Sequence, residues 1–553
     1  IRIYVDESYL KNEVFDLDIL NDYLYALNKA KNTLQQLINV EREQNKIKIN
    51  DYPDLFVGDY YENFKVSAIN SSLLAGAELD ADLVIFVRQK TAKECNEKVG
   101  VLKRNSKNRP IIGYITIDPS LYAKIQDYTK EVLSTVCLHQ FTHVLGFLKS
   151  EITFHKELLT LEKKNITNRI SNGKMIEKYV ISSTNLVNFA KSYFNCQDLK
   201  YIELEDFQDK CEDNLHWEAR ILNGEYMTSF INVQDQAISE FTLILLDDMQ
   251  FYQTNKYTGG LMKFGKNVNC SFFTMDCNYI LTVKPNNSSD TRGSYFLNEF
   301  CSGSQKTTCS SSRTSRGICQ DFYHSTALAS GSPYFRVSDW GYYGNMYADY
   351  CPISTGDLQA DNVESYSYIG NCKLGKVNDE NIGHNAFLFW NTKLEIYNYK
   401  IFSENYGENF SDTSFCAFSS VIHRSEPSSK RNIYQYFVRP TCYQMFCSQK
   451  SLTIRINTQY IVCPRQGGYI SIGGDYEGHL LCSDYNLICS QTEPCNNMFD
   501  CVDKKSLAKN LTYDYTPFNV SSQILLPGNT TNFAKAYEQS DDGKCPLQCS
   551  ECN

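Results

Sequence analysis

Two histidines at positions 139 and 143 have the spacing that metal chemistry requires. They lie in the segment HQFTHVLGF, which runs from His139 to Phe147 inside a predicted helix. Side chains four residues apart project from the same helical face, so both imidazoles can bind one Zn²⁺ ion. The alternative is a core helix that contains two histidines by chance, although the chain has only 8 histidines. Spacing alone leaves both interpretations open.

The helix that carries this pair is expected to run roughly from residue 130 to 149. Apolar residues flank the histidines on most sides, which favours a largely buried helix. Gly146 is a natural stop, because glycine permits a left-handed turn that would redirect the chain toward a third ligand.

The segment from His139 resembles the HExxHxxGF motif of leishmanolysin-like metzincins, in which an inserted domain displaces the third histidine far downstream. His216 and Met227 lie at matching places, with the family's spacing of eleven residues between the third histidine and the methionine of the turn beneath the zinc. The resemblance implies a zinc metalloproteinase fold with His139, His143 and His216 as ligands of one Zn²⁺. It extends over about residues 1 to 490, through the segments Tyr201–Asp206, Phe251–Gln253, Phe264–Gly265, Asp349–Pro352 and Gly467–Ile470.

The family's disulfides imply four pairs here, and three other cysteines are left without an assigned partner. The implied pairs are Cys196–Cys270, Cys277–Cys351, Cys463–Cys482 and Cys447–Cys489, and the cysteines without a partner are Cys95, Cys137 and Cys211. Cys137, on the buried helix, is interpreted as a small apolar filler.

Gln140 occupies the position at which the family has its catalytic glutamate. That glutamate takes a proton from water and delivers it to the leaving amine. A glutamine amide has almost the same shape but no usable proton affinity near neutral pH. Neither Glu131 nor Glu151 is placed to substitute, because both lie outside the histidine face. The expectation is a bound zinc with little or no peptidase activity.

Three functions are consistent with these residues. The first is a zinc-binding, catalytically impaired surface protein that serves adhesion, protein recognition or extracellular assembly, as the surface location of leishmanolysins suggests. The second is a weak but active zinc metalloendopeptidase. The third is a purely structural glycoprotein without metal. The expected partners are extracellular or surface proteins and peptides, and the chain could be an assembly subunit.

Composition places the protein in an oxidising, extracellular or cell-surface setting. The 22 cysteines favour disulfides over zinc fingers, because no repeated CxxC pairs occur. The net charge of −10 does not indicate a basic surface of the kind that binds nucleic acid or anionic membranes. The start at Ile1 suggests a removed signal peptide and pro-segment, and any membrane anchor would lie beyond Asn553. Candidate glycosylation sites are Asn70, Asn165, Asn409, Asn510, Asn519 and Asn529.

Hydrophobic patterning predicts an α+β protein. A strand at 1–5, a helix at 15–42, buried strands at 83–87 and 111–117 and a helix at 235–249 are expected. Taken with the resemblance to leishmanolysin-like metzincins, these elements imply four parts. They are a metzincin-like N-terminal α/β domain with the zinc-site helix (1–149), an inserted mixed central domain with the third histidine and the Met-turn (150–277), a disulfide-rich, mostly β C-terminal domain (278–490) and a Cys/Asn-rich tail (491–553).

Overall fold

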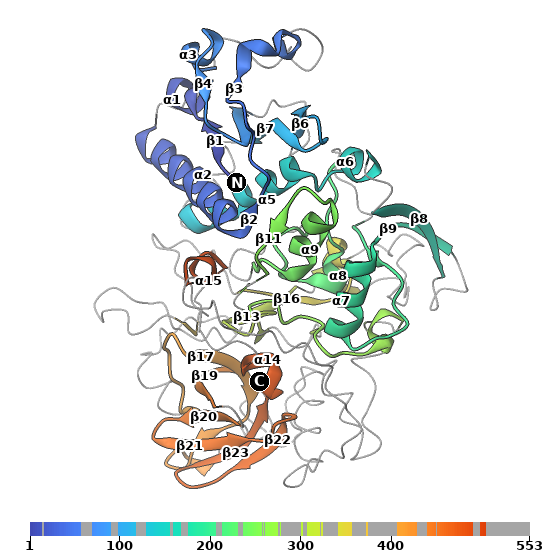
Figure 1. Cartoon of the computed structure of the whole chain (residues 1–553). Helices are drawn as coiled ribbons and strands as arrows, with labels where there is room; N and C mark the ends of the chain where they lie inside the picture. The colour runs from blue at the N-terminus through green and yellow to red at the C-terminus, as the bar shows by residue number, and fades with distance from the viewer. Residues whose placement is uncertain are drawn as a thin grey trace.

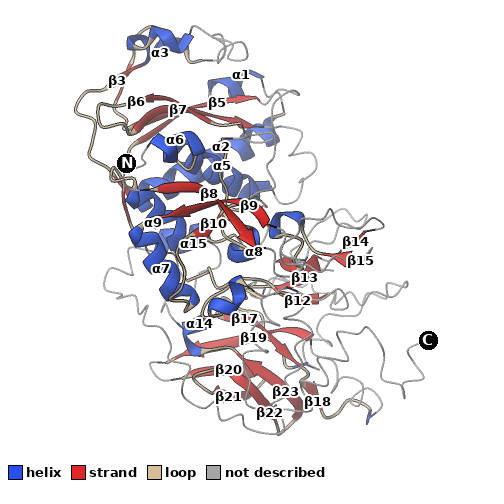
Figure 2. Ribbon diagram, turned by 90° about the vertical axis from the view of Figure 1, so that its right-hand side faces the viewer, coloured by secondary structure: helices blue, strands red, loops and turns tan. Residues whose placement is uncertain are grey.

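Mixed helices and sheets make up the N-terminal half of the chain, and a mostly β region follows (Figures 1 and 2). The structure is a computed structural model. It describes residues 1–13, 16–56, 69–89, 98–117, 129–154, 159–167, 175–205, 213–229, 236–256, 258, 260–274, 277, 300–301, 307–320, 322–324, 341–356, 372–373, 406–428, 439–448, 451–489 and 498–504.

A four-stranded sheet organises the N-terminal part, with the strand order β1-β5-β7-β6. These strands are β1 (Ile3–Asp6), β5 (Leu83–Gln89), β7 (Pro110–Ile117) and β6 (Gly100–Arg104). The first three run parallel and are rich in Val and Ile, as buried parallel strands commonly are. β6 pairs antiparallel with β7 and is the last strand of this sheet among the described residues. The three strands expected in this region are confirmed, and β6 is an additional one.

Two long helices cover one face of this sheet. Helix α2 (Leu17–Leu37) begins at Asp16, whose carboxylate accepts hydrogen bonds from the backbone N–H groups of Asp18 and Ile19. It is shorter than the expected helix at 15–42, because β2 (Ile38–Asn39) follows at once and pairs with β11 (Gln253–Thr254). Helix α5 (Thr129–Leu145) packs beside α2.

The central part continues the same hydrophobic core. Its main elements are α6 (Lys149–Phe154), the hairpin β8 (Thr160–Thr167) and β9 (Met175–Ser182), α7 (Thr184–Phe194), β10 (Ile202–Glu203), α8 (Ala219–Leu222) and α9 (Glu240–Asp248). α9 confirms the expected helix near 235–249. One cluster of buried side chains joins Leu27 of α2, Phe141 of α5 and Phe241 of α9. Residues 1–149 and 150–277 thus share a core, and the domain boundaries stay predictions.

The C-terminal region is mostly β and rich in disulfides. Its largest sheet contains β17 (Ser414–Ser419), β18 (Ile422–His423), β19 (Arg439–Cys447), β20 (Leu452–Ile456), β21 (Gln459–Cys463), β22 (Gly468–Ile472) and β23 (Tyr476–Cys482). The sheet encloses a second core. The disulfides among the described residues include the four implied pairs and also Cys301–Cys319, Cys309–Cys416 and Cys372–Cys442.

Helix α15 (Met498–Lys504) lies within the stretch assigned to the tail and packs back against α2 (Figure 1). Its Phe499 and Val502, three residues apart and so on one helical face, are buried in the core that the N-terminal and central parts share. The other tail residues lie outside the described part. No helix among the described residues is both long enough and apolar enough to cross a membrane.

Candidate metal centre

Helix α5 packs against the sheet beneath it at a glycine. Gly113 of β7 faces the helix, and a Cβ atom at this position would lie 2.5 Å from a methyl carbon of Val144. A glycine is therefore required for the observed approach of strand and helix. The contact places the helix, with His139, Gln140 and His143, in a fixed position over the sheet.

The helix ends at Leu145, and Gly146 adopts a φ of +132°, which only glycine tolerates readily. The Leu145 carbonyl accepts a hydrogen bond from the buried Tyr252 hydroxyl at 2.8 Å. Beyond the turn, Leu148 forms a β-bridge with Asn214. The chain after the helix therefore runs beside the segment that contains His216.

His216 is held by backbone hydrogen bonds on both sides of its position. Its carbonyl accepts from the N–H of Glu205 at 3.0 Å, and the N–H of Trp217 donates to the Met227 carbonyl at 3.0 Å. The Trp217 side chain is fully buried, with its ring 5.0 Å from that of Phe147. These contacts fix the direction in which the His216 side chain projects from the backbone.

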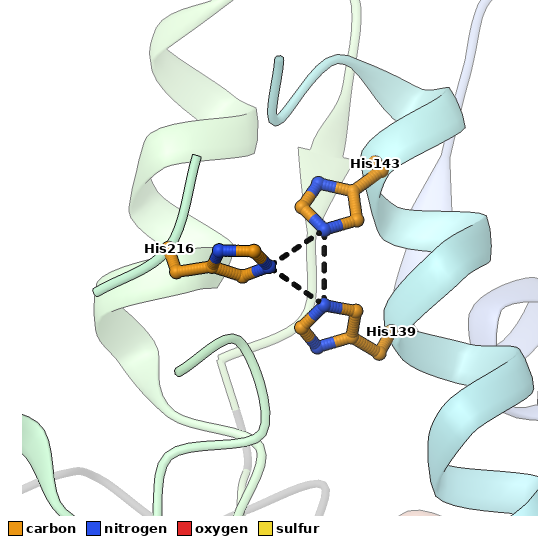
Figure 3. A group of neighbouring side chains, drawn as sticks. All are labelled: His139, His143 and His216. Carbon is orange, nitrogen blue, oxygen red and sulfur yellow. Dashed lines mark hydrogen bonds between the residues drawn. The ribbon is translucent and has the colours of Figure 1, made fainter. Parts of the chain in front are cut away.

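The three histidines converge on one point (Figure 3). The Nε2 atoms are 2.9 Å apart for His139 and His143, 3.1 Å for His139 and His216, and 3.3 Å for His143 and His216. His139 and His143 are buried, while His216 is partly exposed. The arrangement thus has one side that solvent reaches.

Hydrogen bonds at the outer nitrogens determine the tautomers of the two helical histidines. Nδ1 of His139 lies 2.7 Å from the Tyr226 carbonyl, and Nδ1 of His143 lies 2.8 Å from the Phe147 carbonyl. A carbonyl only accepts, so each Nδ1 carries the proton and donates it. In the neutral rings each Nε2 then presents a lone pair toward the shared point. Two lone pairs at this separation repel unless a cation lies between them.

The donor set fits zinc. A circle through the three Nε2 atoms has a radius of about 1.8 Å, which is compatible with all three nitrogens binding one ion at the usual Zn–N distance of ~2.0–2.1 Å. Carbonyl partners at the outer nitrogens are also typical of zinc-binding histidines. Within the part of the chain that the structure describes, these residues form the one cluster of this kind.

Gln140 lies in the same helix between the two histidines and is buried. Its Oε1 atom has no hydrogen-bond partner among the described residues. The Glu151 carboxylate is engaged elsewhere, because Arg104 of β6 forms an ion pair with it. The side chain of Glu131 is not among the described parts of the structure. Of the three cysteines without an assigned partner, Cys95 and Cys211 lie outside the described residues, and Cys137 is a buried free thiol, as expected.

Two residues that support the histidines, Tyr226 and Thr142, were not identified from the sequence, whereas Met227 was. Tyr226 contributes the carbonyl that orients His139, and its hydroxyl lies 3.0 Å from that of Thr142 on the helix. Met227 is fully buried in the turn that follows. A backbone carbonyl carries no signal in residue type, so motif reasoning could locate the methionine but not the acceptor beside it.

Among the candidate glycosylation sites, three lie in the described part. Asn165 is exposed on β8, and Asn409 is partly exposed. Asn70 is also partly exposed, and its side chain accepts hydrogen bonds from Ser72, the third residue of its own acceptor motif. Asn510, Asn519 and Asn529 lie outside the described residues.

The similarity to known proteins extends well beyond the histidine segment. A family model described as leishmanolysin matches residues 19–496. A leishmanolysin-like peptidase of Drosophila melanogaster is 25% identical over 333 residues, which cover 51% of this chain and 48% of that protein. Leishmanolysin of Leishmania major is 26% identical over 361 residues, which cover 63% of this chain and 52% of that protein.

A leishmanolysin homolog of Crithidia fasciculata is 26% identical over 248 residues, which cover 45% of this chain and 34% of the homolog. The chain thus spans about half the length, or less, of the curated relatives it matches. The family match nevertheless covers most of the sequence and includes all three histidines. The chain belongs to the leishmanolysin family.

Proposed function

We propose that this protein binds one zinc ion through His139, His143 and His216 and that its peptidase activity is impaired because Gln140 replaces the general base. The convergence of three Nε2 atoms, two of them with lone pairs set by backbone carbonyls, is the observation that carries the zinc assignment. Members of the family are zinc metalloproteases, which agrees with this donor set. When bound, zinc in such sites polarises a carbonyl group and acidifies water.

The role of Gln140 follows from what an amide can and cannot do. Its Oε1 atom can accept a hydrogen bond from water, but the group cannot take up a proton and pass it to a leaving amine. General acid–base assistance contributes about 10²–10⁴-fold to the rate of such reactions. Glu151 does not compensate, because it is buried in an ion pair with Arg104. We therefore expect peptide cleavage to be slower by about this factor.

A protein that retains the peptide-binding surfaces can still recognise other proteins. Strand β6 ends the N-terminal sheet, and Arg104 links it to the helix that follows the histidine segment. An edge strand of this kind can pair with an extended peptide through backbone hydrogen bonds. Retention of an uncleaved peptide would suit adhesion, protein recognition or extracellular assembly.

The proposed location is extracellular or at the cell surface. Disulfides persist in oxidising compartments and are rare in the cytosol, and seven disulfides join pairs of described cysteines in this chain. Glycosylation at the exposed Asn165 would agree with this location. The partners that fit are surface or secreted proteins and peptides.

A weakly active metalloendopeptidase is the second candidate. The intact set of three histidines favours it, because zinc and a correctly placed water can support slow hydrolysis without a strong base. A structural glycoprotein without metal is the third possibility. Elemental analysis separates this last function from the other two.

The decisive experiment compares the wild-type protein with Gln140→Glu and Gln140→Met. Zinc content is measured for each protein, and cleavage of a peptide library is followed with and without a chelator. We expect all three proteins to hold about one zinc, the Glu variant to cleave peptides about 10²–10⁴-fold faster than wild type, and the Met variant to gain nothing. Chelator-sensitive turnover by wild type at the level of Gln140→Glu would refute impairment, and a wild type without zinc would refute the metal site.

A further inference from the structure

The turn from Glu225 to Met227 contacts both arms of the histidine cluster. On one side, the Tyr226 carbonyl accepts the hydrogen bond from Nδ1 of His139. On the other side, the Met227 carbonyl accepts from the N–H of Trp217, the residue after His216. Any shift of this short turn would therefore move the helical histidine and the distant histidine relative to each other.

The carboxylate of Glu225 holds this turn in place from within the core. The residue is 0% exposed, and its two oxygens accept hydrogen bonds from the Met227 N–H, the Ser239 hydroxyl at 2.8 Å and the Thr242 hydroxyl at 2.7 Å. Thr242 Oγ1 in turn accepts from the indole N–H of Trp217 at 2.9 Å. The carboxylate thus connects the turn, the start of α9 and the tryptophan beside His216.

Burial of a carboxylate costs desolvation free energy, so its presence under a turn suggests that its capacity to accept several hydrogen bonds is needed. Burial raises the pKa of Glu225 to about 7, although the hydrogen bonds from Thr242, Met227 and Ser239 act in the opposite direction. Three donors converge on its two oxygens. No neutral side chain of similar size accepts at both terminal positions, because an amide has an NH₂ group at one of them.

We propose that Glu225 is a positioning residue for the metal centre. It holds His139 in place through the Tyr226 carbonyl and His216 through Thr242 and Trp217, so that the two histidines stay at ligand spacing. This inference rests on the proposed zinc site. Groups that orient metal ligands from behind typically contribute 10–100-fold to metal affinity. Loss of the carboxylate should therefore weaken zinc binding by about 10–100-fold without removing a ligand.

Glu225→Gln is the test variant, because it preserves size while placing an NH₂ group against the donors around the carboxylate. Glu240→Gln is the matched control. Glu240 is also buried and is located on α9, where its carboxylate accepts from the Thr258 hydroxyl at 3.2 Å. This hydrogen-bond partner lies outside the Glu225–Met227 turn, so the same chemical change should leave zinc affinity within about threefold of wild type.

The measurements are zinc affinity by competition with a chromophoric chelator, the visible spectrum of the cobalt-substituted protein, and the melting temperature of the metal-free protein. Support would be a 10–100-fold loss of affinity and an altered cobalt spectrum for Glu225→Gln, with a metal-free melting temperature close to that of Glu240→Gln. Unchanged affinity and spectrum in a folded Glu225→Gln would overturn the inference while leaving the proposed zinc site intact.

Thr242→Val provides the second variant if Glu225→Gln does not fold. It removes the hydroxyl that joins the carboxylate to the Trp217 indole and keeps the side-chain shape. A loss of zinc affinity of at least about tenfold would support the inference, and wild-type affinity would overturn it. Absence of zinc from the wild-type protein would overturn both the inference and the proposed function.

Discussion

Removal of Lys178 should destabilise the protein severely. The lysine lies on β9 with its side chain 0% exposed, and its Nζ atom is 2.9 Å from a Glu218 oxygen and 2.5 Å from an Asp349 oxygen. A Glu203 oxygen lies at 4.0 Å, and all three carboxylates are at most 7% exposed. Lys178→Met would keep most of the apolar stem and remove the cation between these acids.

The loss of unfolding free energy follows from the buried carboxylates that remain without a cation after Lys178→Met. Breaking a buried ion pair by removal of one partner costs about 3–5 kcal/mol, because a charge stays buried without compensation. The control is Lys163→Met on the same hairpin, where the pair with Glu177 is 47% and 54% exposed. Exposed pairs contribute about 0–1 kcal/mol. The two lysines thus differ in burial while sharing a hairpin and a type of partner.

Calorimetric melting of the zinc-supplied protein provides the assay. For a cooperative unit of 150–250 residues, each kcal/mol lowers the melting temperature by about 2–4 °C, so Lys178→Met should lower it by about 6–20 °C and Lys163→Met by less than about 4 °C. Adding Asp349→Asn to Lys178→Met should restore part of the loss, because one uncompensated charge is removed. Equal melting temperatures for the two lysine variants would refute the reasoning.

Two further predictions concern the N-terminal sheet. Gly113→Ala should destabilise the protein by about 1–3 kcal/mol, since the new Cβ would force Val144 and its helix away from β7, and a melting temperature equal to wild type would contradict this. Burial opposes ionisation of Asp82, but hydrogen bonds from Arg2 and from the Glu43 N–H outweigh it and lower the pKa of Asp82 to about 2. The stabilisation from the ionised Asp82 is therefore complete above about pH 4 and disappears as the pH falls through about 2. After allowance for solvent screening, Asp82→Asn should lower the free energy of unfolding by about 1–2 kcal/mol at pH 7 and by progressively less in acid. Urea titrations at several pH values would measure this difference.

Much of the N-terminal fold could be predicted, because periodicity reports burial directly. The runs at 83–87 and 111–117 are continuous and apolar, and they form parallel strands buried on both faces. Strand β6 was missed because its residues, GVLKR, are only half-buried and show no clear alternation. The expected end of α2 was five residues too late, since pairing with β11 converts Ile38 and Asn39 to a strand, and that partner lies more than 200 residues away.

The candidate site shows the same division between local and distant information. The helical pair and its glycine are visible in nine consecutive residues, whereas His216 could be assigned only through the family resemblance. Four disulfide pairs were implied in the same way and are present, while three others were not foreseen, because cysteine counts do not determine connectivity. Acceptors such as the Tyr226 carbonyl depend on the folded backbone and have no signature in residue type.

The geometry of the cluster also limits how the protein can move. The histidines come from two parts of the chain that are 73 residues apart at their nearest, yet their Nε2 atoms lie within 3.3 Å of one another. The Lys149 N–H donates to the Asp213 carbonyl at 2.8 Å, and the Asp213 carboxylate accepts from both the N–H and the hydroxyl of Ser150. A hinge between these parts would break such contacts and separate His216 from the helix. These contacts therefore favour a closed junction, in which the helix and the segment of His216 stay together.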